Sequence, residues 1–209
     1  MNSRLDKISL EAVEKRYGPH LIFSGVSFEV GKGDSVCFWG PNGSGKSTLL
    51  KITAGLISAS AGKVKYASRT KTGPPAMYKN TIGVVAPDVL MYEELTPEEN
   101  LEFTMNARGF KRDSEYEASL FARFDLEDAR HEQVGNFSSG MKQKFHIISA
   151  LAHKPSALLF DEPSSYMDLS GREQISRIIN EMKSEIILII ATNDPEEKDW
   201  CNEYVELCN

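Results

Sequence analysis

The chain has 209 residues, of which 41% are hydrophobic and 26% are charged, and it carries a formal net charge of -6. This length suits one compact domain, and the apolar share is sufficient to fill its core. The acidic balance argues against a protein whose main work is nucleic-acid binding, because such proteins present a basic face. We therefore expect no nucleic acid among its partners.

The three cysteines, Cys37, Cys201 and Cys208, show neither a metal-ligand spacing nor a disulfide framework, which is typical of a reducing compartment. The longest strongly apolar run, at residues 186–191, is far shorter than the ~20 residues that span a bilayer. Residues 1–10 contain no apolar signal core. We therefore expect a cytoplasmic protein, for which another chain would supply any membrane span.

The first half of the chain alternates predicted strands with turns and one helix. Ile8, Leu10 and Ala12 alternate with polar residues, which predicts a half-buried strand. The strand predicted at 35–39 is short and continuously apolar, as expected of a buried strand. Further strands are predicted at 23–30, 62–66 and 81–86, with a helix at 49–56 and a polar loop at 67–75.

The second half begins with helices and returns to strands. Thr96 is a typical N-cap, Pro97 suits the first helical position, and two glutamates fill the first turn. The runs at 157–160 and 186–190 are continuously apolar, which predicts parallel strands covered on both faces. The alternation indicates an α/β sheet with an inserted helical section. The remaining predicted elements are helical patterns up to about residue 131, helices at 139–152 and 172–182, and a closing stretch at 204–207.

A glycine-rich segment at 40–48, GPNGSGKST, lies between the buried strand and the first helix. Gly, four residues and Gly-Lys-Ser fit the phosphate-loop pattern in its required strand–loop–helix context. The glycines let backbone N–H groups turn inward around a polyphosphate, and the helix N-terminus adds its positive dipole end. We therefore expect Lys46 to bridge the outer phosphates of a nucleoside triphosphate and the Ser47 hydroxyl to bind Mg²⁺.

Two carboxylates, Asp161 and Glu162, follow the apolar strand at 157–160. A strand end in such a sheet lies beside the ligand crevice, and so beside the phosphate loop. We expect Asp161 to hold Mg²⁺ through water and Glu162 to polarise the attacking water. An acidic turn alone is a weak signal, but together with the phosphate loop it indicates hydrolysis of a nucleoside triphosphate.

A third motif, FSSGM at 137–141, resembles the Leu-Ser-Gly-Gly-Gln signature of ATP-binding cassette (ABC) ATPases. The run DEPSSYMD at 161–168 resembles the Walker B and D-loop segment of that family. The resemblance covers nearly the whole chain in the family's order. It implies a P-loop NTPase core with a mainly parallel sheet, an antiparallel β subdomain and an inserted helical subdomain. These would form one domain over 1–209, with the core at about 1–88 and 157–209 and the helical subdomain at about 89–156.

The resemblance also implies roles for single residues. Tyr17 matches the aromatic residue that stacks on adenine. Ser138 and Gly140 match the signature residues that contact the γ-phosphate bound to the other subunit, and Lys46 and Glu162 match catalytic groups. The ATP-binding residues of the phosphate loop would be Asn42, Gly43, Ser44, Gly45, Lys46, Ser47 and Thr48.

Two positions depart from the family pattern, because Asp88 stands where the family usually has Gln and Asn193 where it usually has His. Asp88 remains an oxygen ligand for Mg²⁺ or water, so we place it with Ser47 and Asp161 in the metal site. Asn193 can still donate to the γ-phosphate and is assigned to catalysis, although it cannot carry a proton. We expect these changes to affect hydrolysis more than binding, and we hypothesise that they have adapted to each other.

The function implied by the resemblance is that of the ATP-binding and hydrolysing subunit of an ABC transporter, with ATP and Mg²⁺ as cofactors. It would dimerise on ATP with a second copy or a paralogue and drive an integral-membrane permease from the inner face of the cell membrane. Residues 89–92 would either line the groove that receives the permease or pack between the two subdomains. The alternatives are a non-transport ABC ATPase in DNA repair or on ribosomes, and a regulatory module with slow hydrolysis.

Overall fold

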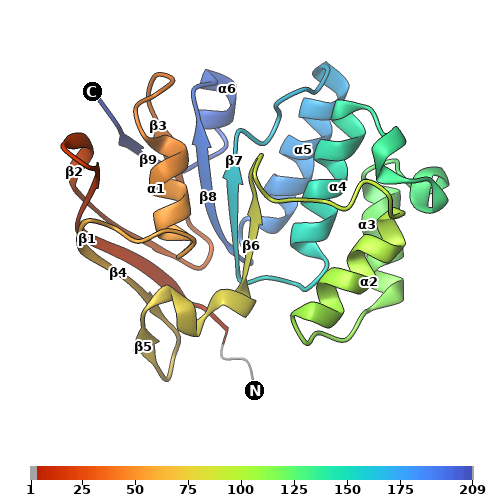
Figure 1. Cartoon of the computed structure of the whole chain (residues 1–209), viewed down its shortest axis with the longest axis horizontal. Coiled ribbons are helices and arrows are strands. Elements are labelled where there is room, and N and C mark those ends of the chain that lie inside the picture. Colours follow the sequence, from red (N-terminus) through yellow and green to blue (C-terminus); the bar gives the residue numbers. More distant parts are fainter. Residues whose placement is uncertain (1–3, 209) are drawn as a thin grey trace.

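The computed structural model describes residues 4–208 and shows two lobes that lie side by side (Figure 1). One lobe contains both β-sheets, and the other consists of helices inserted between two strands of the first. This arrangement confirms the expected α/β class. Within residues 4–208, no helix is both long and apolar enough to cross a membrane.

A five-stranded parallel sheet runs through the centre of the molecule in the order β6-β7-β8-β3-β9. In its register, Ile189 of β8 lies opposite Val36 of β3 on one side and Leu159 of β7 on the other. Because the strands are parallel, the carboxyl ends of β3, β6, β7 and β8 meet at one edge. The strands are β3 (Ser35–Trp39), β6 (Ile82–Val85), β7 (Ala157–Asp161), β8 (Ile187–Thr192) and β9 (Glu203–Glu206).

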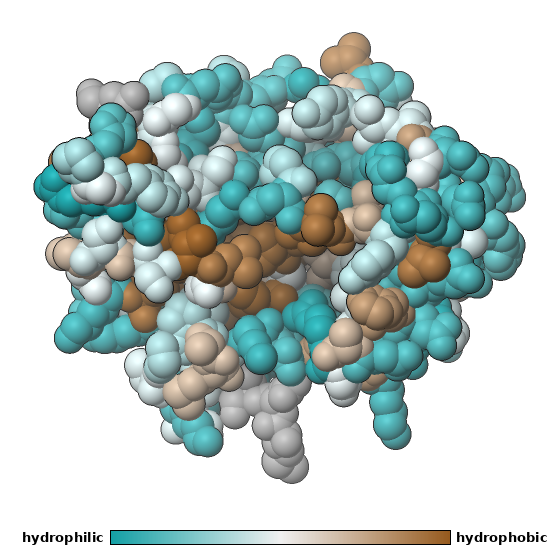
Figure 2. Space-filling view, in the orientation of Figure 1, coloured by the Kyte–Doolittle hydropathy of each residue, from teal (hydrophilic) through white to brown (hydrophobic). Residues whose placement is uncertain are grey.

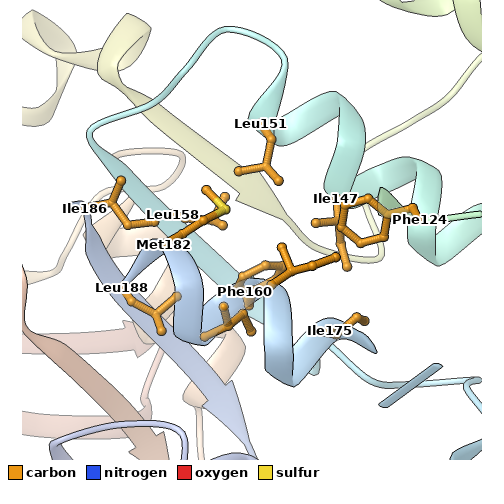
Figure 3. Close-up of a pocket in the computed structure, with 11 residues that line it drawn as sticks. Phe124, Ile147, Leu151, Leu158, Phe160, Ile175, Met182, Ile186 and Leu188 are labelled. Atoms are coloured by element: carbon orange, nitrogen blue, oxygen red, sulfur yellow. The ribbon is translucent and has the colours of Figure 1, made fainter. Parts of the chain in front are cut away.

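One face of this sheet packs against α4 (Ser139–Leu151) and α5 (Leu169–Met182) (Figure 3). Leu158 and Phe160 of β7 and Leu188 of β8 point toward side chains from these two helices. The cavity left between them has a volume of about 10 Å³ and is lined only by apolar side chains. A space so small and so apolar is hydrophobic core rather than a ligand site.

The other face of the parallel sheet is covered by α1 (Lys46–Thr53) and by a second, antiparallel sheet of order β2-β1-β4-β5. Leu49 and Leu50 of α1 are buried in a cluster that also contains side chains from both sheets. The structure thus contains the antiparallel β subdomain, and its shortest strand lies in the segment expected to be a polar loop. The strands are β1 (Lys7–Tyr17), β2 (His20–Gly31), β4 (Ala61–Ala67) and β5 (Thr72–Gly73).

The strand β1 contains a bulge that the sequence alternation did not predict. Ile8 and Leu10 are buried as expected, but Ala12 is exposed and Val13 is buried in its place. Ala12 has a positive φ of 46°, and its N–H donates to Ser27 Oγ at 2.8 Å. The pairing of β1 with β2 shifts between Leu10 and Val13. The extra residue therefore exchanges the buried and exposed faces of the strand beyond this point.

The helical lobe is inserted between β6 and β7. Thr96 caps its first helix as predicted, since its side chain accepts from Glu99 N while the Glu99 carboxylate accepts from Thr96 N at 2.8 Å. The short α6 (Pro195–Lys198) lies in the sheet lobe. The helical lobe contains α2 (Pro97–Ala107), α3 (Ser114–Arg123) and α4, with 3-10 turns at Asp128–His131 and Val134–Asn136. Two more 3-10 turns, at Pro75–Met77 and Lys79–Thr81, precede β6.

A buried asparagine, Asn100 of α2, fixes the segment that leads into the helical lobe. Its Oδ1 accepts from Tyr92 N at 2.9 Å, and its Nδ2 donates to Tyr92 O at 2.9 Å. The backbone N–H groups of residues 134 and 135 donate to carbonyl groups of the same segment. Residues 92–96 are therefore a rigid part of the helical lobe.

A second contact ties the far end of the helical lobe to the beginning of β6. Arg108 donates from Nη2 to Ile82 O at 3.3 Å and lies 3.3 Å from Nε2 of His153, which in turn lies 3.0 Å from Ile82 O. Burial lowers the pKa of His153 to about 4, and the charge of Arg108 adds to this shift. The imidazole is therefore neutral near pH 7, and it contacts both the guanidinium of Arg108 and the ring of Phe110, whose centroid is 5.3 Å from its own.

Candidate functional site

The phosphate loop lies between the end of β3 and the start of α1, with a backbone that requires glycine at two positions. Gly45 has a φ of 94°, and a Cβ added there would lie 2.6 Å from Ile22 Cγ2. Gly40 has a φ of 151°, and its added Cβ would lie 2.3 Å from Leu207 O. Any side chain at either position would force the loop away from β2 or from the C-terminal segment.

The loop wraps around its own lysine. Lys46 is buried, and its Nζ donates to Gly40 O and Pro41 O, both at 2.9 Å. Ser44 Oγ is buried and has no hydrogen-bond partner within residues 4–208. The first N–H groups of α1 have no partner within the helix, as at every helix start, and Gly45 at the N-cap provides no side-chain acceptor. A buried cation, a hydroxyl without a partner and several backbone donors together fit a polyphosphate.

Ser47 and Asp161 meet where α1 begins and β7 ends. Ser47 Oγ donates to Asp161 Oδ1 at 2.9 Å. The end of β7 therefore lies beside the phosphate loop, as predicted. Burial raises the pKa of Asp161 above its ordinary value, the Ser47 hydrogen bond opposes this shift, and the charge of Glu162 adds to it. A divalent cation would favour the ionised form, and hydroxyl and carboxylate oxygens are the ligands that Mg²⁺ prefers. The residues present therefore fit the expected metal.

Glu162 follows Asp161 in a strained conformation, with a φ of 51°. Its N–H donates to Ala191 O of β8 at 2.8 Å, which fixes its backbone to the neighbouring strand. Its carboxylate is half-buried and accepts from Ser165 Oγ at 3.1 Å. Glu162 thus lies at the sheet edge, in the same groove as Asp161, and its water-activating role stays a prediction.

Asp88 comes shortly after β6, at the same edge, and forms an ion pair with Lys51 of α1 at 2.9 Å. The Lys51 hydrogen bond lowers the pKa of Asp88 below its ordinary value. The charges of both residues also act on the pKa of Asp161, Asp88 raising it and Lys51 lowering it. Asp88 therefore belongs to the electrostatic environment of Asp161, with Lys51 as its partner, and its role as a metal ligand stays a prediction.

Asn193 follows β8 and donates from Nδ2 to Asn42 Oδ1 of the phosphate loop at 2.8 Å. This contact brings Asn193 to the nucleotide site. The described residues contain no hydrogen bond or ion pair between Asn193 and Asp88, because each is held by a different partner. The hypothesis that these two positions have adapted to each other is therefore not supported by a direct contact between them.

Tyr17 lies at the end of β1, where the residue is 54% exposed. Lys15 Nζ lies 4.7 Å from the ring centroid, so one face of the ring already carries a cation. An exposed aromatic ring outside the core is available for stacking, and its proposed contact with adenine stays a prediction.

The signature segment opens α4 on the helical lobe. Ser138 is the N-cap of this helix, and its Oγ accepts from a backbone N–H three residues later at 3.2 Å. A Cβ added to Gly140 would lie 3.5 Å from Tyr166 O, and Gln143 donates from Nε2 to Pro163 O at 3.0 Å. Within its own chain, the signature segment therefore contacts the loop that follows β7.

A groove of about 500 Å³ separates the start of α4 from the segment after Asp88. Asp161 and Glu162 line it, and so do residues 89–91. Among residues 4–208, Leu90 is the most exposed large apolar residue, at 88%, whereas Tyr92 packs edge-on against Phe103 of α2 with ring centroids 4.8 Å apart. The segment 89–92 thus divides into an exposed part and a part packed against the helical lobe.

A second hollow lies between the lobes on the face shown in Figure 2, where brown, apolar side chains gather near the centre of the view. Its volume is about 560 Å³. Apolar residues from the end of α1, β6 and α2 line it, together with the cations Lys79 and Arg108. The apolar lining residues are Ala54, Leu56, Pro75, Ala76, Ile82, Val84, Val89 and Ala107.

Sequence reasoning missed two side chains at this site, Lys51 and Glu197. Lys51 looks like any exposed helix lysine, and its partner Asp88 is distant in the chain. Glu197 lies in the acidic run of α6, which reads as a solvated turn, yet it is buried and bonded to Ser164. Both contacts depend on tertiary structure, so no local pattern indicates them.

Comparisons with known proteins agree with this geometry. A family model described as ABC transporter matches residues 23–165, more than half of the chain. The chain is 32% identical over 205 residues to the ABC transporter ATP-binding protein YxlF of Bacillus subtilis (strain 168), covering 97% of this chain and 68% of that protein.

Two solved structures extend the agreement. The ATP-binding subunit of an ABC transporter matches with a TM-score of 0.83 and 28% identity, over 96% of this chain and 85% of that one. A dimeric structure of a bacterial ABC transporter cassette has the same fold, with a TM-score of 0.82 and 23% identity, over 96% and 94% of the two chains. These matches support the transport interpretation and not its alternatives. The chain therefore belongs to the ABC transporter family, as an ATP-binding and ATP-hydrolysing subunit.

Proposed function

We propose that this chain hydrolyses ATP with Mg²⁺ where the phosphate loop meets the end of β7, in a head-to-tail dimer that drives a membrane permease. The main support for a hydrolytic site there is the hydrogen bond between Ser47 Oγ and Asp161 Oδ1. It brings two oxygen ligands together near the buried amine of Lys46 and the carboxylate of Glu162. Mg²⁺ bound there would neutralise charge that develops on the phosphate oxygens.

The protein's own groups would divide the remaining work. Lys46 would exchange its two carbonyl contacts for phosphate oxygens. Glu162 would orient a water and accept its proton as the water oxygen attacks the γ-phosphorus. The bond from that phosphorus to the β–γ bridging oxygen breaks, and ADP leaves. Asn193 would turn its amide from Asn42 to the γ-phosphate, and Tyr17 would stack on the adenine.

The partner subunit, a second copy or a paralogue, would complete each site. Ser138 is exposed at the N-terminus of α4, where its hydroxyl and the helix dipole suit a γ-phosphate bound to the other chain. Tyr166, beside this helix start, and Leu169, the first residue of α5, are 80% and 77% exposed, and a partner surface would cover them. A dimeric cassette with the same fold supports this arrangement.

The permease would dock in the hollow between the lobes shown in Figure 2. Its apolar lining suits the side of a short helix, and a segment bound there contacts both the nucleotide-binding lobe and the helical lobe. Docking would hold the chain at the inner face of the cell membrane. Val89 lines both this hollow and the groove beside Glu162, so it connects the two.

The substitution Glu162→Gln tests the hydrolytic role. The amide keeps the shape of the side chain but cannot accept the proton, so we expect ATP to bind with unchanged affinity, hydrolysis to fall by at least about 10²-fold, and an ATP-bound dimer to accumulate. Equilibrium titration, phosphate release and size-exclusion chromatography with ATP and Mg²⁺ measure the three quantities. A variant that hydrolyses ATP at the parental rate would refute the assignment.

A further inference from the structure

The loop after β7 is held in an unfavourable backbone conformation. Both Glu162 and Tyr166 have positive φ angles, 51° and 66°, and neither is glycine. Each such residue costs on the order of 1 kcal/mol or more, and it persists only where surrounding contacts fix it. The loop therefore needs an anchor, and the contacts of its middle residue, Ser164, show where that anchor lies.

Glu197 of α6 makes these contacts from outside the loop. Its Oε1 accepts from Ser164 N at 2.8 Å and also from Ser164 Oγ. Both side chains are buried, each with 2% of its surface exposed. The second carboxylate oxygen of Glu197 is buried as well and has no partner within residues 4–208. Burying a carboxylate with so few partners is costly, so packing alone does not account for this residue.

The position of Glu197 in the chain indicates a role at the nucleotide site. Its helix starts directly after Asn193 and Asp194, and Asn193 contacts Asn42 of the phosphate loop. Glu197 therefore connects two segments of the nucleotide site, the one that follows β8 and the one that follows β7. The backbone N–H of Glu162 already bonds to β8, so the contact with Ser164 fixes the loop on the other side of the catalytic carboxylate.

We propose that Glu197 is a positioning residue for Glu162. It acts through Ser164 and keeps the loop in the strained shape that holds the Glu162 carboxylate at the sheet edge. This proposal rests on the proposed role of Glu162. Because the side-chain hydrogen bonds of Glu197 go to Ser164 and not to the phosphate loop, its loss lowers the rate of hydrolysis while leaving the affinity for ATP nearly unchanged.

The test compares six variants in the full chain: Glu197→Ala, Glu197→Gln, Ser164→Ala, the double variant of Glu197→Ala with Ser164→Ala, Glu196→Ala and Glu162→Gln. A displacement of a catalytic group by about 1 Å can cost on the order of 10²-fold in rate. We therefore expect Glu197→Ala to lower kcat by about 10- to 100-fold, with the ATP dissociation constant within about twofold of the parental value. Ser164→Ala keeps the backbone donor and should lose less.

Coupling between the two residues separates positioning from general damage. If Glu197 acts through Ser164, the double variant is no slower than Glu197→Ala alone. Glu196→Ala, a substitution of the exposed neighbour on the same helix, should leave kcat unchanged. Glu197→Gln keeps an acceptor for Ser164 and should recover most of the rate. The melting temperature is measured for every variant, and if Glu197→Ala fails to fold, a fall in kcat for Ser164→Ala at unchanged ATP affinity carries the test.

Two outcomes overturn the proposal. One is a parental kcat in both Glu197→Ala and Ser164→Ala while Glu162→Gln is inactive, which leaves the proposed function standing. The other is a parallel loss of ATP affinity and kcat, which would make Glu197 a purely structural residue. If Glu162→Gln itself hydrolyses ATP normally, the proposed role of Glu162 fails first.

Discussion

The ion pair between Lys51 and Asp88 makes a quantitative prediction about nucleotide affinity. Three carboxylates stand at the edge of the sheet, those of Asp88, Asp161 and Glu162, and Lys51 neutralises the first of them. The substitution Lys51→Met removes this charge and keeps the length of the side chain. The unpaired Asp88 then repels the phosphates of an incoming nucleotide, so ATP should bind more weakly.

The expected loss of ATP affinity follows from how exposed the side chains of Lys51 and Asp88 are. The side chain of Asp88 is 60% exposed and that of Lys51 is 27% exposed, so water screens the pair. Such pairs contribute at most about 1 kcal/mol. Since about 1.4 kcal/mol corresponds to a tenfold change in an equilibrium constant, we expect ATP affinity to fall by no more than about fivefold.

The assay is an equilibrium titration with a fluorescent ATP analogue, with Mg²⁺ and with EDTA, on Lys51→Met, Asp88→Asn and the double variant. Lys51→Met should weaken binding only when residue 88 is Asp. Lys32→Met is the control, because it breaks an exposed pair with Glu185 near the opposite end of β3 and should change nothing. If Lys51→Met costs the same affinity with and without the Asp88→Asn substitution, Lys51 acts on the nucleotide directly and the reasoning is refuted.

Three further predictions concern other residues. Lys46→Ala should abolish ATP binding or hydrolysis in a folded protein, because the only buried cation of the phosphate loop is lost; near-parental ATPase activity would contradict this. Asn193→His should change the rate of hydrolysis more than ATP affinity and add a pH dependence near ~6.5, the unperturbed histidine pKa, so a flat rate–pH profile would exclude Asn193 from the reaction. The pKa of His153 is lowered from 6.5 to about 4, so the unfolded chain binds its proton first as pH falls. The free energy of unfolding should therefore decrease between about pH 6.5 and about pH 4, and urea unfolding of His153→Gln should show a smaller decrease.

Much of the nucleotide site could be predicted because its residues lie at fixed places in the fold. In a parallel sheet the strand ends meet at one edge, so residues that follow apolar runs, such as Asp161 and Asn193, had to come near the phosphate loop. The observed contacts of Ser47 with Asp161 and of Asn42 with Asn193 follow from that rule. Their roles in binding and hydrolysis stay predictions.

The features that were not predicted share a different cause. The bulge in β1 depends on a left-handed alanine, Ala12, which carries none of the usual turn signals. The pairs Lys51–Asp88 and Glu197–Ser164 join residues from separate elements, and each member alone looks like an ordinary polar residue. Periodicity reports which face of an element is buried, but not which polar side chain finds a partner across the fold.

The helical lobe is connected to the sheet lobe at two places, so it can rotate about one of them like a lever. One end is pinned, since Arg108 and His153 both contact the carbonyl of Ile82. At the other end, residues 92–96 are fixed to the lobe, so the backbone of residues 86–91 must absorb any rotation. The helix α4 has 13 residues, which makes the arm from the pin to Ser138 about 20 Å long. A turn of about 10° about the pin would then carry the signature segment through about 3.5 Å, a distance comparable to a hydrogen bond, while the bending falls on the segment that holds Asp88.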